Sequence, residues 1–109
     1  MTTDEKIALA EKIANQLIGI TASDWNRWVR FAESAGLASA LRMAQILARS
    51  QSLRPGPKRS YEAIANTLPK FGELRQLSSQ EIEEIFGYVT RCLVGRGAFI
   101  NETARPSRH

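Results

Sequence analysis

Apolar residues recur every three or four positions along most of the chain, and this period predicts helices. The first predicted helix begins at Thr2, which has Glu5 three residues later, the spacing of a capping box, and it ends at Gly19. Its apolar face consists of Ile7, Ala10, Ile13, Ala14, Leu17 and Ile18. We expect this face to pack against the core.

Two longer helices follow. The second predicted helix has Thr21 or Ser23 as its N-cap and ends at Gly36, and its apolar face consists of Trp25, Trp28, Val29, Ala32 and Ala35. The third runs from Leu37 to about Ser50, and we expect it to be largely buried. Its apolar side consists of Leu37, Leu41, Ala44 and Leu47 or Ala48, and Met43 and Ile46 widen that side. Its remaining strip faces water or a partner and consists of Arg42, Gln45, Arg49 and Ser52.

Residues 53–60 are predicted to form an exposed loop, because Pro55, Gly56 and Pro57 follow one another. Ser60 is then expected to cap a short helix that ends before Pro69. One looser turn over residues 70–77 would place Phe71, Leu74 and Leu77 on the core.

The last predicted helix begins with a second capping-box pattern, Ser78 and Glu81, and ends at Gly95. Its apolar period is the clearest in the chain and consists of Ile82, Ile85, Phe86, Val89, Cys92 and Leu93. We therefore predict an all-α protein without a sheet, a compact bundle of about five helices, three long and two short. Residues 1–97 form its single domain, and residues 98–109 form a flexible C-terminal tail in which Phe99 and Ile100 are candidates for a hydrophobic latch.

The supply of chemically active side chains argues against an enzyme. Cys92 is the one cysteine and His109 the one histidine among 109 residues, which excludes an intramolecular disulfide and leaves no Cys/His zinc site or histidine-based catalysis. Glu81, Glu83 and Glu84 fall in the first turn of a predicted helix, where acids stabilise the helix dipole. We expect a non-catalytic protein with no metal, cofactor or small-molecule substrate.

No apolar run approaches the roughly 20 residues that span a bilayer, and the N-terminus carries acids where a secretory signal carries bases. The sequence therefore favours a cytoplasmic protein without a membrane partner.

Charge is unevenly distributed along the chain. The net charge is +4, and arginine outnumbers lysine eleven to four. Residues 21–60 hold seven bases against Asp24 and Glu33 only. The seven bases are Arg27, Arg30, Arg42, Arg49, Arg54, Lys58 and Arg59. We predict that they, with the neighbouring Gln45, contact nucleic acid or a partner. The alternative is ordinary solvation, together with the preference of cations for a helix C-terminus.

The sequence also places three aromatic residues beside two of these arginines. Trp25, Trp28 and Phe31 are candidates for docking a partner, because Trp and Arg are enriched in binding hot spots. The alternative is that the two tryptophans belong to the core, since they share an apolar face with Val29 and Ala32.

The run AGLASALRMAQ, residues 35–45, resembles the small helical subunit of multi-protein CRISPR effector complexes. That resemblance implies a non-catalytic subunit lining a nucleic-acid channel and transfers no site residue. The first hypothesis is therefore a basic helical module that contacts RNA or DNA as a subunit of a larger complex. The alternative is a protein-protein adaptor or homodimer that buries Trp25, Phe31 or Met43 against its partner.

Overall fold

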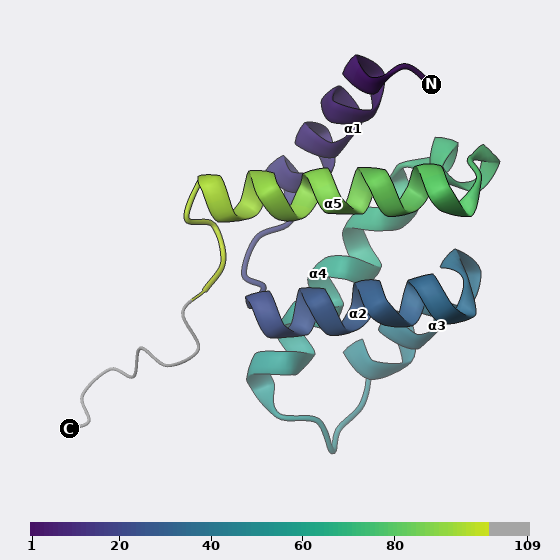
Figure 1. The fold of residues 1–109 in the computed structure, drawn as a ribbon. Helices are drawn as coiled ribbons and strands as arrows, with labels where there is room; N and C mark the ends of the chain where they lie inside the picture. The colour runs from purple at the N-terminus through teal and green to yellow at the C-terminus, as the bar shows by residue number, and fades with distance from the viewer. Residues whose placement is uncertain (101–109) are drawn as a thin grey trace.

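The computed structural model describes residues 1–100, which form five α-helices and two short 3₁₀ turns (Figure 1). The helices are α1 (Thr3–Gln16), α2 (Ala22–Ala35), α3 (Leu37–Ala48), α4 (Pro55–Thr67) and α5 (Ser79–Gly95), and the turns η1 (Leu68–Lys70) and η2 (Gly72–Gln76) join α4 to α5. The predicted all-α bundle of about five helices is confirmed. Among residues 1–100 the β pairing is limited to one isolated bridge between Thr21 and Ile100. No helix in this part of the chain is both long and apolar enough to cross a membrane.

Both predicted capping boxes are present. Glu5 N donates to the Thr2 hydroxyl at 3.1 Å, and Thr2 N donates to the Glu5 carboxylate at 2.7 Å. The same exchange joins Ser78 and Glu81, at 3.2 and 3.1 Å. The backbone N–H of each cap residue stabilises the charged carboxylate, which lowers the pKa of Glu5 and of Glu81 below the usual value.

Polar contacts between α1 and α5 join corresponding ends of the two helices. Lys6 Nζ lies 2.7 Å from Glu84 Oε1 near their N-terminal ends, and Arg96 donates to the Asn15 side chain near their C-terminal ends. The Glu84 carboxylate raises the pKa of Lys6. The apolar faces of both helices supply much of the core between these contacts.

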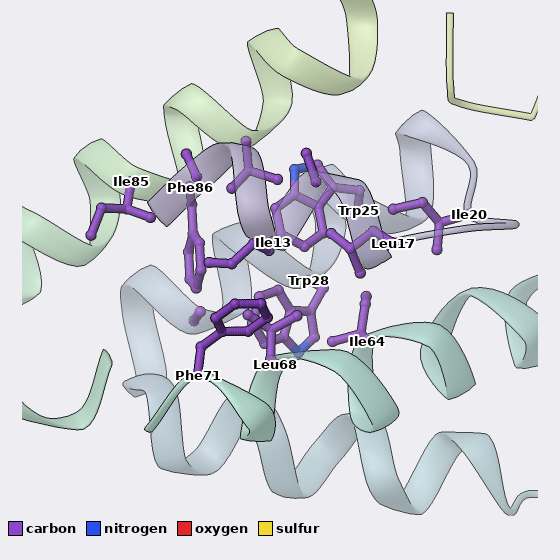
Figure 2. Close-up of a cluster of buried hydrophobic side chains, with 14 of the residues drawn as sticks. Ile13, Leu17, Ile20, Trp25, Trp28, Ile64, Leu68, Phe71, Ile85 and Phe86 are labelled. Atoms are coloured by element: carbon purple, nitrogen blue, oxygen red, sulfur yellow. The ribbon is translucent and has the colours of Figure 1, made fainter. Parts of the chain in front are cut away.

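Two tryptophans and a phenylalanine form the centre of the core (Figure 2). The rings of Trp25 and Trp28 stack with their centroids 5.5 Å apart, and Phe86 of α5 lies 5.7 and 5.3 Å from them. Aromatic pairs at such distances add to the stability that comes from burying their area. The contact therefore couples α2 to α5 across the middle of the molecule.

A single residue, Gly36, separates α2 from α3. Its backbone has φ 93° and ψ 159°, a conformation that is essentially restricted to glycine. The prediction that α3 is largely buried is wrong: only Ala40 and Ala44 of this helix are buried, and Ile46 is 62% exposed. These small residues let the α3 backbone lie close to α2 and α4. The larger side chains of α3 therefore lie beside these helix contacts rather than within them.

The start of α4 also differs from the prediction. The loop predicted for residues 53–60 is wrong over residues 55–60, because α4 begins at Pro55 with Arg54 as N-cap. Prolines in the first three helical positions remove N–H groups that have no intrahelical partner, and Gly56 lacks the Cβ that disfavours a helical residue before Pro57. Ser60 is not a cap, since it is fully buried within α4 and its hydroxyl accepts from Thr21 N at 3.3 Å.

Helix α1 ends earlier than predicted, at Gln16 rather than at Gly19. Leu17 and Ile20 remain buried, but the assignment of Ile18 to the apolar face is wrong because this side chain is 78% exposed. The extended backbone after residue 16 turns Ile18 away from the core.

The chain turns back after α5 through Gly97, which has φ 62°. Ala98 N donates to Leu93 O at 2.9 Å and Gly97 N to Val94 O at 3.0 Å, the two bonds of a Schellman motif. Phe99 then packs against the core, as the latch hypothesis proposed. The assignment of Ile100 to the latch is wrong, because its side chain is 45% exposed, although its backbone N donates to Ile20 O at 2.9 Å. The rest of the predicted tail, residues 101–109, lies outside the described residues.

Candidate nucleic-acid interface

Positive and negative charges occupy different helix pairs. Residues 34–61 contain no acid and five bases, and they form α3, the connection to α4 and the first half of α4. Helices α1 and α5 together carry six acids against three bases. Figure 1 shows α1 and α5 on one side of the molecule and the connection between α3 and α4 on the opposite side. The fold therefore keeps the connection between α3 and α4 away from the carboxylates of α1 and α5.

Four bases gather where α3 passes into α4. Arg49 is the C-cap of α3 and Arg54 the N-cap of α4, and Lys58 and Arg59 follow in its first turns. The three arginines are exposed and Lys58 is half-buried. We call these four residues the basic bend.

No residue of the basic bend forms an ion pair within the described chain. The ion pairs among residues 1–100 join Met1 to Glu81, Lys6 to Glu84 and Arg27 to Asp24, so none involves the bend. The first turn of α4 has neither an acid nor a side-chain cap. The N-terminal end of α4 carries a partial positive charge and the C-terminal end of α3 a partial negative charge, so the two helix dipoles offset each other here. The positive potential therefore comes from the four side chains.

Arg42 and Gln45 are exposed on the strip of α3 that leads to Arg49. Arg42 and Arg49 lie two turns apart, about 10 Å along the helix axis. Arg42 and Gln45 also line a hollow of about 590 Å³ whose opposite wall includes Arg75 of η2. Sequence reasoning missed Arg75, whose position in a segment expected to form a loose turn gave no indication that it faces α3.

Two predicted contact residues, Arg27 and Arg30, belong to α2 and so lie outside the basic bend. Arg27 is exposed, and its Nη1 atom lies 3.5 Å from Oδ1 of the buried Asp24. Arg30 is exposed and has no ion pair among residues 1–100. Arg27 is thus already engaged with a carboxylate of its own helix.

The burial of Trp25, Trp28 and Phe31 decides whether these aromatic residues dock a partner or belong to the core. Trp25 and Trp28 are both 0% exposed, so the prediction that they dock a partner is wrong and the core alternative is confirmed. Phe31 is half-buried and packs against the core from its edge. An adaptor face built on Trp25 is therefore excluded.

Other chemistry is sparse in the described chain. Residues 1–100 contain no group of three or more His, Cys, Asp or Glu side chains arranged to hold a metal ion. Cys92 is half-buried beside the core, and its thiol is unpaired.

Comparison of the chain with protein-family models, with curated proteins and with solved structures found no match.

Proposed function

We propose that this protein is a non-catalytic binding module that contacts the phosphate backbone of nucleic acid through the basic bend. The observation that carries the proposal is the concentration of Arg49, Arg54, Lys58 and Arg59 at one end of the molecule, without a carboxylate partner among residues 1–100. A cluster of this kind has its hydrogen-bonding capacity free for an external anion.

Phosphate is the anion that this chemistry favours. A guanidinium group donates two parallel hydrogen bonds to a phosphate, and each neutralised phosphate releases condensed counterions into solution. The strip of α3 through Arg42 would extend the contact along the backbone of the nucleic acid. The buried tryptophans offer no ring for stacking a base, so affinity would depend mainly on charge.

The proposed role is that of a basic subunit in a larger cytoplasmic complex. The exposed cations on one bend form a small contact area, which suits a module that works beside other nucleic-acid-binding chains. No reaction is assigned to the protein.

The test is binding of labelled single-stranded RNA, single-stranded DNA and duplex DNA of equal length, measured by fluorescence anisotropy. With four phosphate contacts on duplex DNA, we expect affinity to fall about 100-fold between 50 and 200 mM salt. Absence of binding at low salt, or affinity that does not change with salt, would refute the proposal.

A matched pair of variants assigns the binding to the bend. R49Q/R54Q/R59Q removes three of its charges and should reduce the salt effect on duplex DNA to about 3-fold over the same range. K12Q/K70Q/R91Q removes three exposed charges elsewhere and should leave most of the affinity and of the salt effect. Equal losses in both variants would mean that net charge, and not the bend, determines binding.

A further inference from the structure

Two adjoining hollows mark the face between the α2–α3 corner and the start of α5. The first, of about 590 Å³, lies between α3 and the η2–α5 segment, and the second, of about 310 Å³, lies between the end of α2 and α5. Leu37 and Ile82 line both hollows, so the two meet along these side chains. Both residues are half-buried and leave apolar surface in the middle of the face.

The two hollows carry opposite charges. Arg42 and Arg75 line the first hollow, and Glu33 and Glu83 line the second. All four side chains are exposed, and none forms an ion pair within the described part of the chain. The face therefore runs from a positive end to a negative end across an apolar centre.

We propose that this face is a two-fold symmetric interface between two copies of the chain. Rotation about an axis through the region of Leu37 and Ile82 places the positive end of one copy on the negative end of the other, and does so twice. A surface that meets itself in this way is the requirement for an isologous dimer. A second copy thus presents the complementary pattern to this face without any further partner.

The shape of the rim agrees with this arrangement. Ala38 is exposed on the wall that α3 contributes to the first hollow, and its small side chain leaves α3 free to approach the partner copy closely. The two α3 helices would run antiparallel, and Leu37 and Ile82 would be removed from water between them. Because opposite charges would meet in a partly dehydrated hollow, salt would screen them less than on an open surface.

Of its charged residues, this interface shares only Arg42 with the proposed nucleic-acid contact. The basic bend lies outside both hollows, since none of its four residues lines either one. Either proposal can therefore fail while the other stands, because E33R/E83R and R75E test the dimer without changing a residue of the nucleic-acid contact.

Sedimentation velocity of the full chain over a range of concentrations tests the dimer. We expect the mass to rise from the 12.1 kDa of one chain toward twice that value. The transition should fall between about 1 and 500 μM, as is usual for small, polar interfaces. A wild-type chain that remains monomeric over this range would overturn the inference.

Charge reversal at the two ends gives a sharper test. R42E/R75E makes both ends negative and E33R/E83R makes both positive, so each variant alone should be monomeric. An equimolar mixture should form a heterodimer, because both end contacts then pair opposite charges, one with the wild-type signs and the other with reversed signs. A mixture that remains monomeric, or variants that dimerise as well as the wild type, would refute the two-fold arrangement.

Controls separate this interface from general charge effects. K12E/R91E and E11R/E62R reverse the same numbers of exposed charges outside the hollows and should retain the dimer. Loss of the dimer in these controls would count against the proposed face. Circular dichroism checks that each variant is folded, and the single reversals R75E and E83R replace any double variant that is not.

Discussion

The indole Nε1 of Trp28 donates a hydrogen bond to the carbonyl oxygen of Ala40, at a distance of 2.9 Å. Both residues are fully buried, and the bond crosses from α2 to α3. It satisfies the one polar atom of a tryptophan in the centre of the core and fixes the position of the helix that carries Arg42 and Arg49. The geometry of the basic surface therefore depends on a contact deep in the core.

Replacing Trp28 by phenylalanine should destabilise the protein. The W28F variant loses the hydrogen bond to Ala40 and leaves unfilled volume beside Phe86, so the free energy of unfolding should fall by about 1–3 kcal/mol. Urea denaturation followed by circular dichroism measures this difference. A change smaller than about 0.5 kcal/mol would show that the indole N–H contributes little.

Removing the buried Ser60 hydroxyl should lower the free energy of unfolding more than removing an exposed hydroxyl. S60A removes the acceptor of Thr21 N inside the protein, and an unsatisfied buried N–H group typically costs about 1–3 kcal/mol. The matched variant S34A removes an exposed hydroxyl and should change stability by less than about 0.5 kcal/mol. Equal effects in thermal or urea unfolding would contradict the role given to Ser60.

Two glycine-to-alanine substitutions should change the free energy of unfolding in opposite directions. G36A forces an alanine into φ 93° and should cost about 1–3 kcal/mol. Gly87 lies within α5, and a Cβ built there meets nothing within 4 Å, so G87A should stabilise the protein by about 0.5–1 kcal/mol. Denaturation curves of the two variants, measured side by side, test whether Gly36 sets the turn between α2 and α3.

Stability should decrease in acid because of the capping carboxylates. The pKa of Glu5 and of Glu81 is lowered in the folded protein, so their contribution is fully present above the unfolded pKa of about 4.3 and is lost as the pH falls through the folded pKa. The variant E5Q/E81Q retains the capping-box acceptor but no longer titrates. Its free energy of unfolding should be close to that of the wild type at pH 7 and should fall less steeply below pH 4; identical acid slopes would contradict the assignment.

Features that depend on neighbouring residues could be predicted from the sequence. The caps at Thr2 and Ser78 are present as the spacing indicated, because a cap needs only a side chain and an N–H group three residues away. For the second helix the sequence offered Thr21 or Ser23, and the structure has Thr21. The apolar period of α5 was likewise sufficient to place Ile85, Phe86, Val89 and Leu93 in the core. The all-α fold follows from these local signals.

The start of α4 and the exposure of α3 required the folded chain. Ser60 has the residue type of a cap, and its role as a buried acceptor depends on Thr21, 39 positions earlier. The expectation for α3 failed because a helix that packs through Ala40 and Ala44 leaves Ile46 exposed, and the sequence does not state how closely two helices approach.

The candidate surfaces also combine features that the sequence determines with features that depend on the folded chain. By itself, the sequence determined the helical fold, the caps at Thr2 and Ser78 and the basic character of residues 21–60, since each depends on residues that are close in the chain. Tertiary structure alone decided that Trp25 and Trp28 are buried and that Arg75 lies across a hollow from Arg42, 33 positions away. The physical reason is that burial and the meeting of distant charges depend on how helices pack, and packing is a property of the whole folded chain.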